Sequence, residues 1–100
     1  MVQAFKPVHA QCVVSQDLPT IRIEFLSRNE LSYQRGDRLV VVPREIEYSD
    51  LGIPTGVAVY LDGLKWSDGS MLTEMELVQL MADLHQAAAP LRVKQFVRAD

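Results

Sequence analysis

Apolar and polar residues alternate along several short stretches of the chain, and this is the pattern of half-buried β-strands. The clearest stretch is 20–26, where Ile21, Ile23 and Phe25 share one face and charged residues occupy the other. Similar patterns or short apolar runs predict further strands at residues 8–14, 31–34, 38–42, 57–61 and 91–97. Residues 44–53 are ambiguous, and Ile46 and Tyr48 suggest a short strand there. Antiparallel sheets commonly bury one face, so the chain is expected to form a mainly antiparallel sheet of about five to six strands.

The strand expected at 38–42 differs from the others because the four residues Leu39 to Val42 are all apolar. Such a run is typical of a strand that is buried on both faces and therefore central in its sheet. Gly36 is expected to close the hairpin before it, and Pro43 is expected to end it, since proline cannot donate a ladder hydrogen bond. Residues 1–7 are predicted to be a loose lead-in to a single domain that spans residues 1–100.

One helix is predicted over about residues 74–88, where the apolar residues recur with helical spacing. Thr73 is its expected N-cap, and Glu76 completes a capping box with it. The predicted apolar stripe comprises Leu77, Leu80, Met81, Leu84 and Ala88, whereas Glu74, Gln79, Asp83 and Gln86 are placed outside. The helix is expected to end before Pro90. The predicted fold class is therefore α+β, with one long helix packed on one face of the sheet.

The composition of this 100-residue chain is that of an ordinary globular domain, with 48% hydrophobic and 23% charged residues. Its net charge is −3 and its lysines and arginines form no block, so a nucleic-acid partner is not expected. No stretch approaches the ~20 apolar residues of a membrane span, and the N-terminus lacks the apolar run of a signal peptide. We therefore expect a soluble, cytoplasmic protein with no membrane partner.

Few residues suggest catalytic or metal chemistry. Cys12 lies in an apolar run and is expected to be a small buried residue. His9 is near it in the sequence, but strand alternation would place the two side chains on opposite faces. His85 is expected to be a half-exposed residue on the helix surface. The sequence therefore predicts no catalytic residue, no metal site, no cofactor and no enzyme activity.

Trp66 is the only tryptophan, and it stands between two polar loops. It is expected to cover the open end of the helix from within the core, with its indole N–H bonded to a backbone carbonyl. The alternative is an interface anchor, because tryptophan is enriched in binding hot spots. The methionines Met71, Met75 and Met81 have helical spacing and are expected to belong to the core.

Residues 45–53 have the composition of a contact surface. Acidic residues alternate there with exposed apolar ones, namely Glu45, Glu47 and Asp50 with Tyr48, Leu51 and Ile53. Pro54, Gly52 and Gly56 indicate a loop around these residues.

Three segments of the chain carry a resemblance to a known family. They are Leu31-Ser32-Tyr33 with Gly36-Asp37-Arg38-Leu39-Val40-Val41, Val59 to Trp66, and Asp68 to Glu76. A tyrosine-bearing strand before a tryptophan, then a polar loop and a capped helix, resembles the small immunity proteins of bacterial polymorphic toxin systems. The resemblance covers residues 31–97, about two-thirds of the chain. The family commonly has a proline in the loop after the tryptophan, where this chain has Ser67-Asp68-Gly69.

The resemblance implies that the chain neutralises a cognate protein toxin by direct, stoichiometric binding in the cytoplasm of the producing cell. On this hypothesis the candidate partner-binding residues are Glu45, Glu47, Tyr48, Asp50, Asp62 and Asp68. The alternative is a small structural or regulatory subunit without enzyme activity that forms a homodimer through an exposed edge of its sheet.

Overall fold

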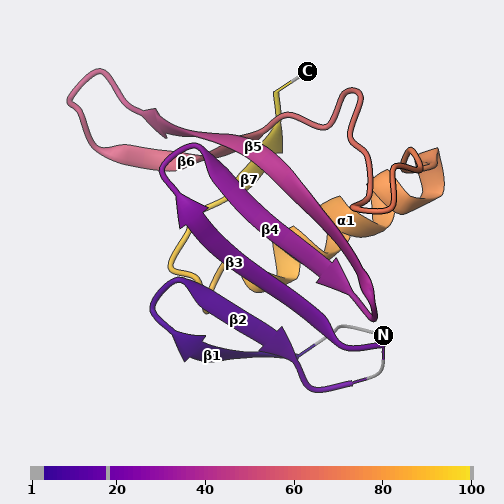
Figure 1. Cartoon of the computed structure of the whole chain (residues 1–100). Helices are drawn as coiled ribbons and strands as arrows, with labels where there is room; N and C mark the ends of the chain where they lie inside the picture. The colour runs from indigo at the N-terminus through magenta and orange to yellow at the C-terminus, as the bar shows by residue number, and fades with distance from the viewer. Residues whose placement is uncertain (1–3, 18, 100) are drawn as a thin grey trace.

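The computed structural model describes residues 4–17 and 19–99, and within them the chain forms one sheet and one helix (Figure 1). The elements are β1 (Phe5–His9), β2 (Cys12–Ser15), β3 (Ile21–Ser27), β4 (Glu30–Arg35), β5 (Arg38–Tyr48), β6 (Pro54–Val59), α1 (Glu74–Ala87) and β7 (Phe96–Arg98). The fold class is α+β, as the sequence predicts, with one or two more strands than expected.

The seven strands of the sheet stand side by side in the order in which they occur in the chain. Each is antiparallel to its neighbour except β7, which is parallel to β6. Helix α1 makes the crossover between these two parallel strands and lies across one face of the sheet (Figure 1).

The hydrophobic core lies between that face of the sheet and the helix. Alternate residues of β3, β4 and β5 point into it, and Leu80 and Leu84 of α1 are fully buried against them. The opposite face of β5 is open to solvent, because the helix covers one side only. Leu39 and Val41 are therefore 36% and 41% exposed, and the prediction that this strand is buried on both faces is wrong.

Strand β5 does not end at Pro43, contrary to expectation. Glu30, the first residue of β4, is opposite Pro43, and Arg44, the residue after Pro43, pairs with Val59 of β6. Proline is tolerated here because β5 changes partners at this position, so the missing N–H interrupts neither ladder. The strand continues to Tyr48, and it joins the β1–β5 part of the sheet to the β5–β7 part.

The two ends of the chain also differ from the sequence prediction. Residues 1–3 lie outside the described part, but Phe5 already belongs to β1, so the expected lead-in of residues 1–7 is shorter than predicted. The single strand expected at 8–14 is a hairpin, which turns at Ala10 and Gln11. The strand expected at 91–97 is reduced to β7, because residues 88–92 continue past the helix in turns.

Helix α1 begins as predicted. Thr73 is the N-cap, and both hydrogen bonds of the capping box with Glu76 are present. Two predictions about which side chains the helix buries are wrong. Asp83 was expected on the solvent side but is fully buried, and Met75 was expected in the core but is 78% exposed. Met71 is also exposed, at 61%. No helix in the described part of the chain is both long and apolar enough to cross a membrane.

Trp66 belongs to the core, with only 4% of its surface exposed. The Arg38 guanidinium lies over its ring, with 4.2 Å between Cζ and the ring centroid, and Arg38 also pairs with Glu76. The indole Nε1 is buried without a well-formed hydrogen bond in the described residues, so the expected bond to a backbone carbonyl is absent. The carboxylate of Glu76 lies near this N–H, and their interaction contributes to lowering the pKa of Glu76.

Candidate protein-binding surface

The β5–β6 hairpin projects beyond the rest of the sheet (Figure 1). Pairing between β4 and β5 stops at Glu30 and Pro43, whereas residues 44–48 of β5 pair with β6 alone among the strands of the described residues. The hairpin therefore presents its tip to solvent, away from the helix.

The tip of the hairpin is held by Ser49. Its backbone N–H donates to the Ile53 carbonyl at 2.8 Å, and its carbonyl accepts from the Gly52 N–H at 2.9 Å. Its hydroxyl accepts from the N–H groups of Leu51 and Ile53, both at 3.3 Å. Gly52 adopts φ +77°, which favours glycine over other residues. These bonds give the tip a defined shape before any partner binds.

Large apolar side chains are exposed on this ordered tip. Leu51 is 85% exposed, and Tyr48 and Ile53 are each 52% exposed. The acidic residues Glu45, Glu47 and Asp50 are also at the surface of the same hairpin. An apolar centre with a charged rim is the common anatomy of a protein-binding surface. We call these six residues the hairpin surface.

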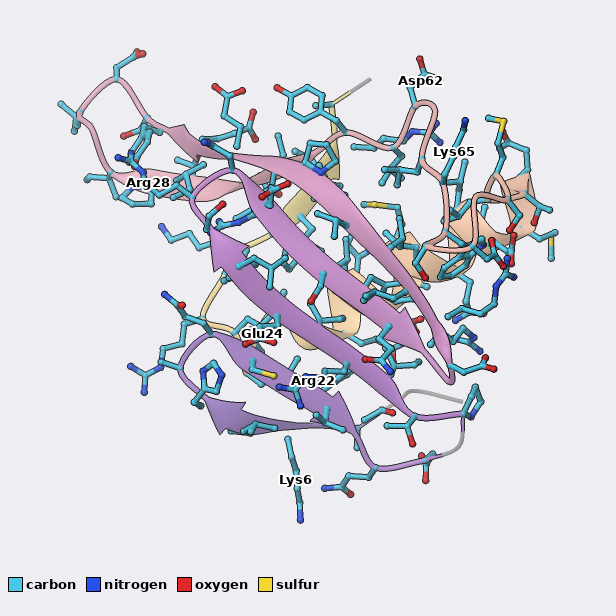
Figure 2. The ribbon with its side chains drawn as sticks, in the orientation of Figure 1. Lys6, Arg22, Glu24, Arg28, Asp62 and Lys65 are labelled. Atoms are coloured by element: carbon cyan, nitrogen blue, oxygen red, sulfur yellow. The ribbon has the colours of Figure 1, made fainter. Side chains whose placement is uncertain are left out.

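A cleft of about 630 Å³ lies between the hairpin and the turn that joins β3 to β4. Glu45, Tyr48 and Tyr60 line it on the side of the hairpin, and Arg28 and Asn29 line it on the side of the turn. The Tyr60 hydroxyl donates to Glu45 Oε2 at 2.7 Å and so fixes the position of this carboxylate. Figure 2 shows Arg28 beside the hairpin.

Arg44 also lines the cleft, and its side chain is 9% exposed. Its guanidinium donates to the Ser27 carbonyl and packs on the Phe25 ring, with 4.1 Å between Cζ and the ring centroid. Burial lowers the pKa of this guanidinium. Arg44 therefore ties the base of the hairpin to the end of β3 and keeps the hairpin surface in a fixed orientation.

The structure brings four of the six predicted partner-binding residues together. Glu45, Glu47, Tyr48 and Asp50 all belong to the hairpin surface. Asp62 lies in the turn after β6, away from the hairpin tip (Figure 2).

Asp68 lies at the opposite end of β5 from Tyr48. It accepts from the backbone N–H of Ser70, and the Ser70 hydroxyl in turn accepts from Arg38, the first residue of β5. Since β5 has eleven residues, its two ends are about 33 Å apart. These contacts lower the pKa of the Asp68 carboxyl, chiefly through the hydrogen bonds from Ser70. One compact partner site on the hairpin does not include Asp68.

Sequence reasoning did not find the residues that shape the cleft, Arg28, Asn29 and Arg44. They come near the hairpin only because β5 continues past Pro43 and carries the hairpin beside the β3–β4 turn. No local pattern indicates that arrangement. The residues of the hairpin surface itself could be picked out from the sequence, because acidic and apolar residues alternate there.

The histidines do not form a nucleophile–base pair in the described residues. His85 Nε2 lies 3.1 Å from the Phe96 carbonyl oxygen, at the junction of α1 and β7. His9 does lie near Cys12, contrary to the prediction from alternation, but its Nε2 pairs with Glu24 at 3.4 Å and its Nδ1 accepts from the Gln11 N–H. Burial raises the pKa of the Cys12 thiol, which disfavours the reactive thiolate.

The chain has no match among protein-family models, curated proteins or solved structures.

Proposed function

We propose that this chain is an immunity protein, which neutralises a cognate bacterial toxin by direct binding through the hairpin surface. The observation that carries the proposal is an ordered, projecting hairpin that exposes Tyr48, Leu51 and Ile53 among acidic residues. The protein acts by stoichiometric binding, in the cytoplasm of the cell that makes the toxin, and without chemistry of its own.

The shape of the hairpin supports insertion into a concave surface. Its tip is ordered by Ser49 and Gly52, so little conformational freedom is lost on binding, and preorganisation of this kind strengthens affinity. Aromatic anchors at the centre of an interface carry much of the binding energy, and Tyr48 is such an anchor here. An active-site cleft of a toxin would be blocked by a hairpin of this form.

The charge of the hairpin defines the complementary partner. Glu45, Glu47 and Asp50 place three exposed carboxylates on the same hairpin as the apolar tip, so the toxin is expected to carry basic groups beside an apolar pocket. Complementary charges of this kind speed association and favour one partner over others. The rate of association should therefore fall as salt concentration rises.

Co-expression with the toxin encoded beside the gene for this chain tests the proposal. The wild-type chain should restore growth, and Tyr48→Ala combined with Leu51→Ala should lose protection. Each side chain is exposed, so the variant should retain the fold. The dissociation constant of the purified pair should rise by about 30-fold or more, as truncation of a hot-spot residue does.

A matched control uses two exposed apolar residues of helix α1. Met75→Ala with Val78→Ala removes similar surface from helix α1, where these residues are 78% and 64% exposed. This variant should protect as the wild type does. Loss of protection in the helix variant but not in the hairpin variant would move the binding surface to α1. A wild-type chain that fails to protect would end the immunity proposal.

The alternative, a homodimeric subunit joined through a sheet edge, has less support. The outer strand β1 contains Lys6 and Pro7 and has an irregular register between Pro7 and His9. Each of these features discourages pairing with another strand. The other edge, β7, has three residues.

A further inference from the structure

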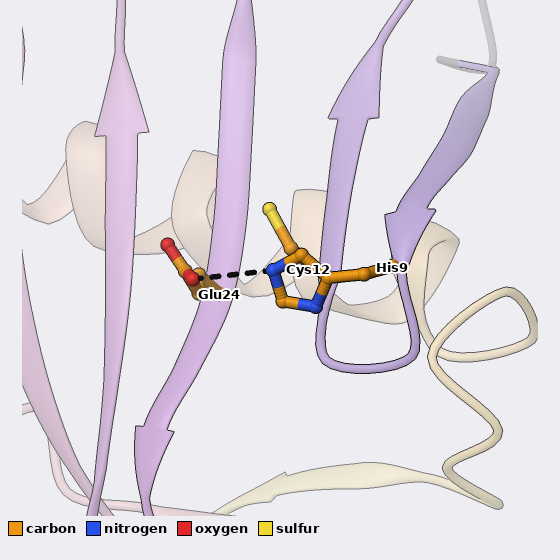
Figure 3. A group of neighbouring side chains, drawn as sticks. All are labelled: His9, Cys12 and Glu24. Atoms are coloured by element: carbon orange, nitrogen blue, oxygen red, sulfur yellow. Dashed lines mark ion pairs between the residues drawn. The ribbon is translucent and has the colours of Figure 1, made fainter.

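Three neighbouring strands bring a nitrogen, a sulfur and an oxygen ligand to one place on the open face of the sheet (Figure 3). His9 of β1, Cys12 of β2 and Glu24 of β3 each offer one such atom, and the three atoms all lie within 4.8 Å of one another. His9 is exposed, Glu24 is partly buried, and Cys12 is fully buried beneath them.

The strand register explains why these residues meet. His9 is paired with Cys12 across the β1–β2 hairpin, and Cys12 is paired with Glu24 across β2 and β3. Residues paired across strands point to the same face of a sheet. The short cysteine stands in the middle of the row, and the longer histidine and glutamate reach over it from either side.

We propose that His9, Cys12 and Glu24 form a binding site for a zinc ion. Imidazole nitrogen, thiolate sulfur and carboxylate oxygen are the three kinds of zinc ligand in proteins. His9 and Cys12 are separated by two residues in a tight turn, which is a common spacing for a pair of zinc ligands. This proposal is independent of toxin binding, because the site lies at the β1 edge and the hairpin surface at the other side of the sheet.

The ligand atoms need a small rearrangement to bind the ion. Ligands of a tetrahedral zinc ion are about 3.5 Å apart. His9 Nε2 and Glu24 Oε2 already lie 3.4 Å apart, and small shifts of these two side chains would bring both to that distance from the Cys12 sulfur. A His9 ring that binds the ion through Nε2 carries its proton on Nδ1, so the 3.2 Å contact from the exposed Gln11 N–H to Nδ1 is given up.

The charged neighbour Arg22 helps to hold the carboxylate. Arg22 Nη2 lies 3.4 Å from Glu24 Oε1, whereas His9 approaches the other oxygen, Oε2. Oε2 is therefore the oxygen available to the ion. A carboxylate that ligates a metal usually has a hydrogen-bonding partner as well, and Arg22 is that partner here. Three protein ligands leave a fourth position, which water can fill from the exposed side of His9.

Metal binding changes the state of the Cys12 thiol. Thiolate is the form that coordinates zinc, so zinc binding requires the Cys12 thiol to give up its proton. Formation of one zinc–sulfur bond should release one proton to solvent, and affinity should fall as pH is lowered.

No metal site was expected from the sequence, because the two histidines lie far apart in it and no cysteine or carboxylate cluster with ligand spacing surrounds them. Alternation along one expected strand also placed His9 and Cys12 on opposite faces, and the turn at Ala10 and Gln11 brings them to the same face instead. The ion would join β1, β2 and β3 through side chains and would stabilise the outer hairpin of the sheet against local opening.

Titration of the reduced, full-length protein with Co²⁺ tests the site, since a cobalt–thiolate bond gives a charge-transfer absorption that other ligands do not. The wild type should show this absorption at one equivalent of Co²⁺ per chain, and Zn²⁺ should displace it. His9→Ala and Glu24→Gln should each weaken Zn²⁺ binding by about tenfold or more, and Cys12→Ala should abolish the absorption. His85→Ala, which alters the other histidine, should bind as the wild type does.

Each other outcome overturns the proposal. Absence of the absorption at excess Co²⁺ would mean that the thiol does not reach a metal. Absorption that is unchanged in both His9→Ala and Glu24→Gln would mean that the cysteine alone binds the ion. One metal per two chains would place the ligands on two copies rather than in one site. Circular dichroism of each variant separates loss of binding from loss of fold.

Discussion

A carboxylate side chain, Asp83, lies fully buried between helix α1 and the sheet. Its Oδ2 accepts hydrogen bonds from the Tyr33 hydroxyl and from Arg35 Nη1, the latter at 3.1 Å, and its Oδ1 accepts from Gln79 at 3.2 Å. A buried carboxylate is costly unless it is paired and hydrogen-bonded in this way. Burial, and then the bond to Asp83, raise the pKa of the Tyr33 hydroxyl well above its ordinary value, so Tyr33 stays a donor.

Replacing Asp83 tests how much this buried hydrogen-bond network stabilises the fold. Asp83→Ala leaves the Tyr33 hydroxyl and the partly exposed Arg35 without their acceptor, and should lower the free energy of unfolding by about 2–3 kcal/mol. Tyr33→Phe should cost about 1 kcal/mol, since Asp83 keeps two other donors. Urea denaturation of both variants and of the double variant measures their coupling. Full additivity would contradict the network.

At the scale of elements, α1 depends on its capping box. Thr73 Oγ1 accepts from the Glu76 N–H at 3.2 Å, and Glu76 Oε1 accepts from the Thr73 N–H at 2.9 Å. Glu76 Oε2 meets Arg38 Nη1 at 2.6 Å, so the same carboxylate links the helix start to β5. These contacts, led by the bond from the Thr73 N–H, lower the pKa of Glu76 below its usual 4.5.

A pH-dependent contribution to stability follows from that shift. A carboxyl whose pKa is lower in the folded state stabilises the fold above its unfolded pKa, and this contribution is lost as pH falls through the folded pKa. The melting temperature of the wild type should therefore exceed that of Glu76→Gln at pH 7, and the difference should shrink below about pH 4.5. Glu74→Gln, in the same turn but outside the capping box, is the control. A difference that does not change with pH would contradict this role.

Removal of the N-cap hydroxyl should weaken the same element at every pH. Thr73→Ala loses one bond of the capping box and should lower the free energy of unfolding by about 1 kcal/mol. Thr73→Ser keeps the acceptor and should restore most of the loss. Urea denaturation at neutral pH compares the two, and equal stability of the alanine and serine variants would show that the hydroxyl contributes nothing.

An element could be predicted when the residues that specify it lie close together in the sequence. The capping box at Thr73 and the turn at Gly36 lie within a few residues of sequence, and both were predicted. The β1–β2 turn at Ala10 and Gln11 has neither glycine nor asparagine, so nothing in the sequence marked it. Strand β5 continues past Pro43 because it changes its partner strand there. Only the assembled sheet shows that change.

The same distinction applies to the sites. The acidic and apolar residues of the hairpin are adjacent in sequence, so local composition identified them. The cleft beside them requires Arg28 and Arg44, which only the sheet brings together. The His9–Cys12–Glu24 cluster requires the register of three strands, and alternation along a single expected strand gave the wrong answer for it.

At the scale of the whole molecule, the sheet of the described residues has β1 and β7 at its edges, and the helix covers one of its faces. Strand β1 has Lys6, Pro7 and an irregular register, and β7 is three residues long, so neither edge offers a long row of unpaired backbone groups. The open face mixes Leu39 and Val41 with charged residues such as Arg22, Glu24 and Glu45. These features favour a monomeric protein.

We therefore predict a monomer, and light scattering at increasing concentrations should give a mass close to the 11.3 kDa of one chain. Replacing both protective residues of the outer strand, Lys6→Thr with Pro7→Thr, should increase self-association, because threonine restores a backbone donor and removes the charge. Lys65→Thr, which removes a charge from an exposed loop residue, should leave the mass unchanged. A wild-type dimer that persists at low concentration would favour the homodimeric subunit over the immunity protein, because a stable pair would need an interface that the edges do not provide.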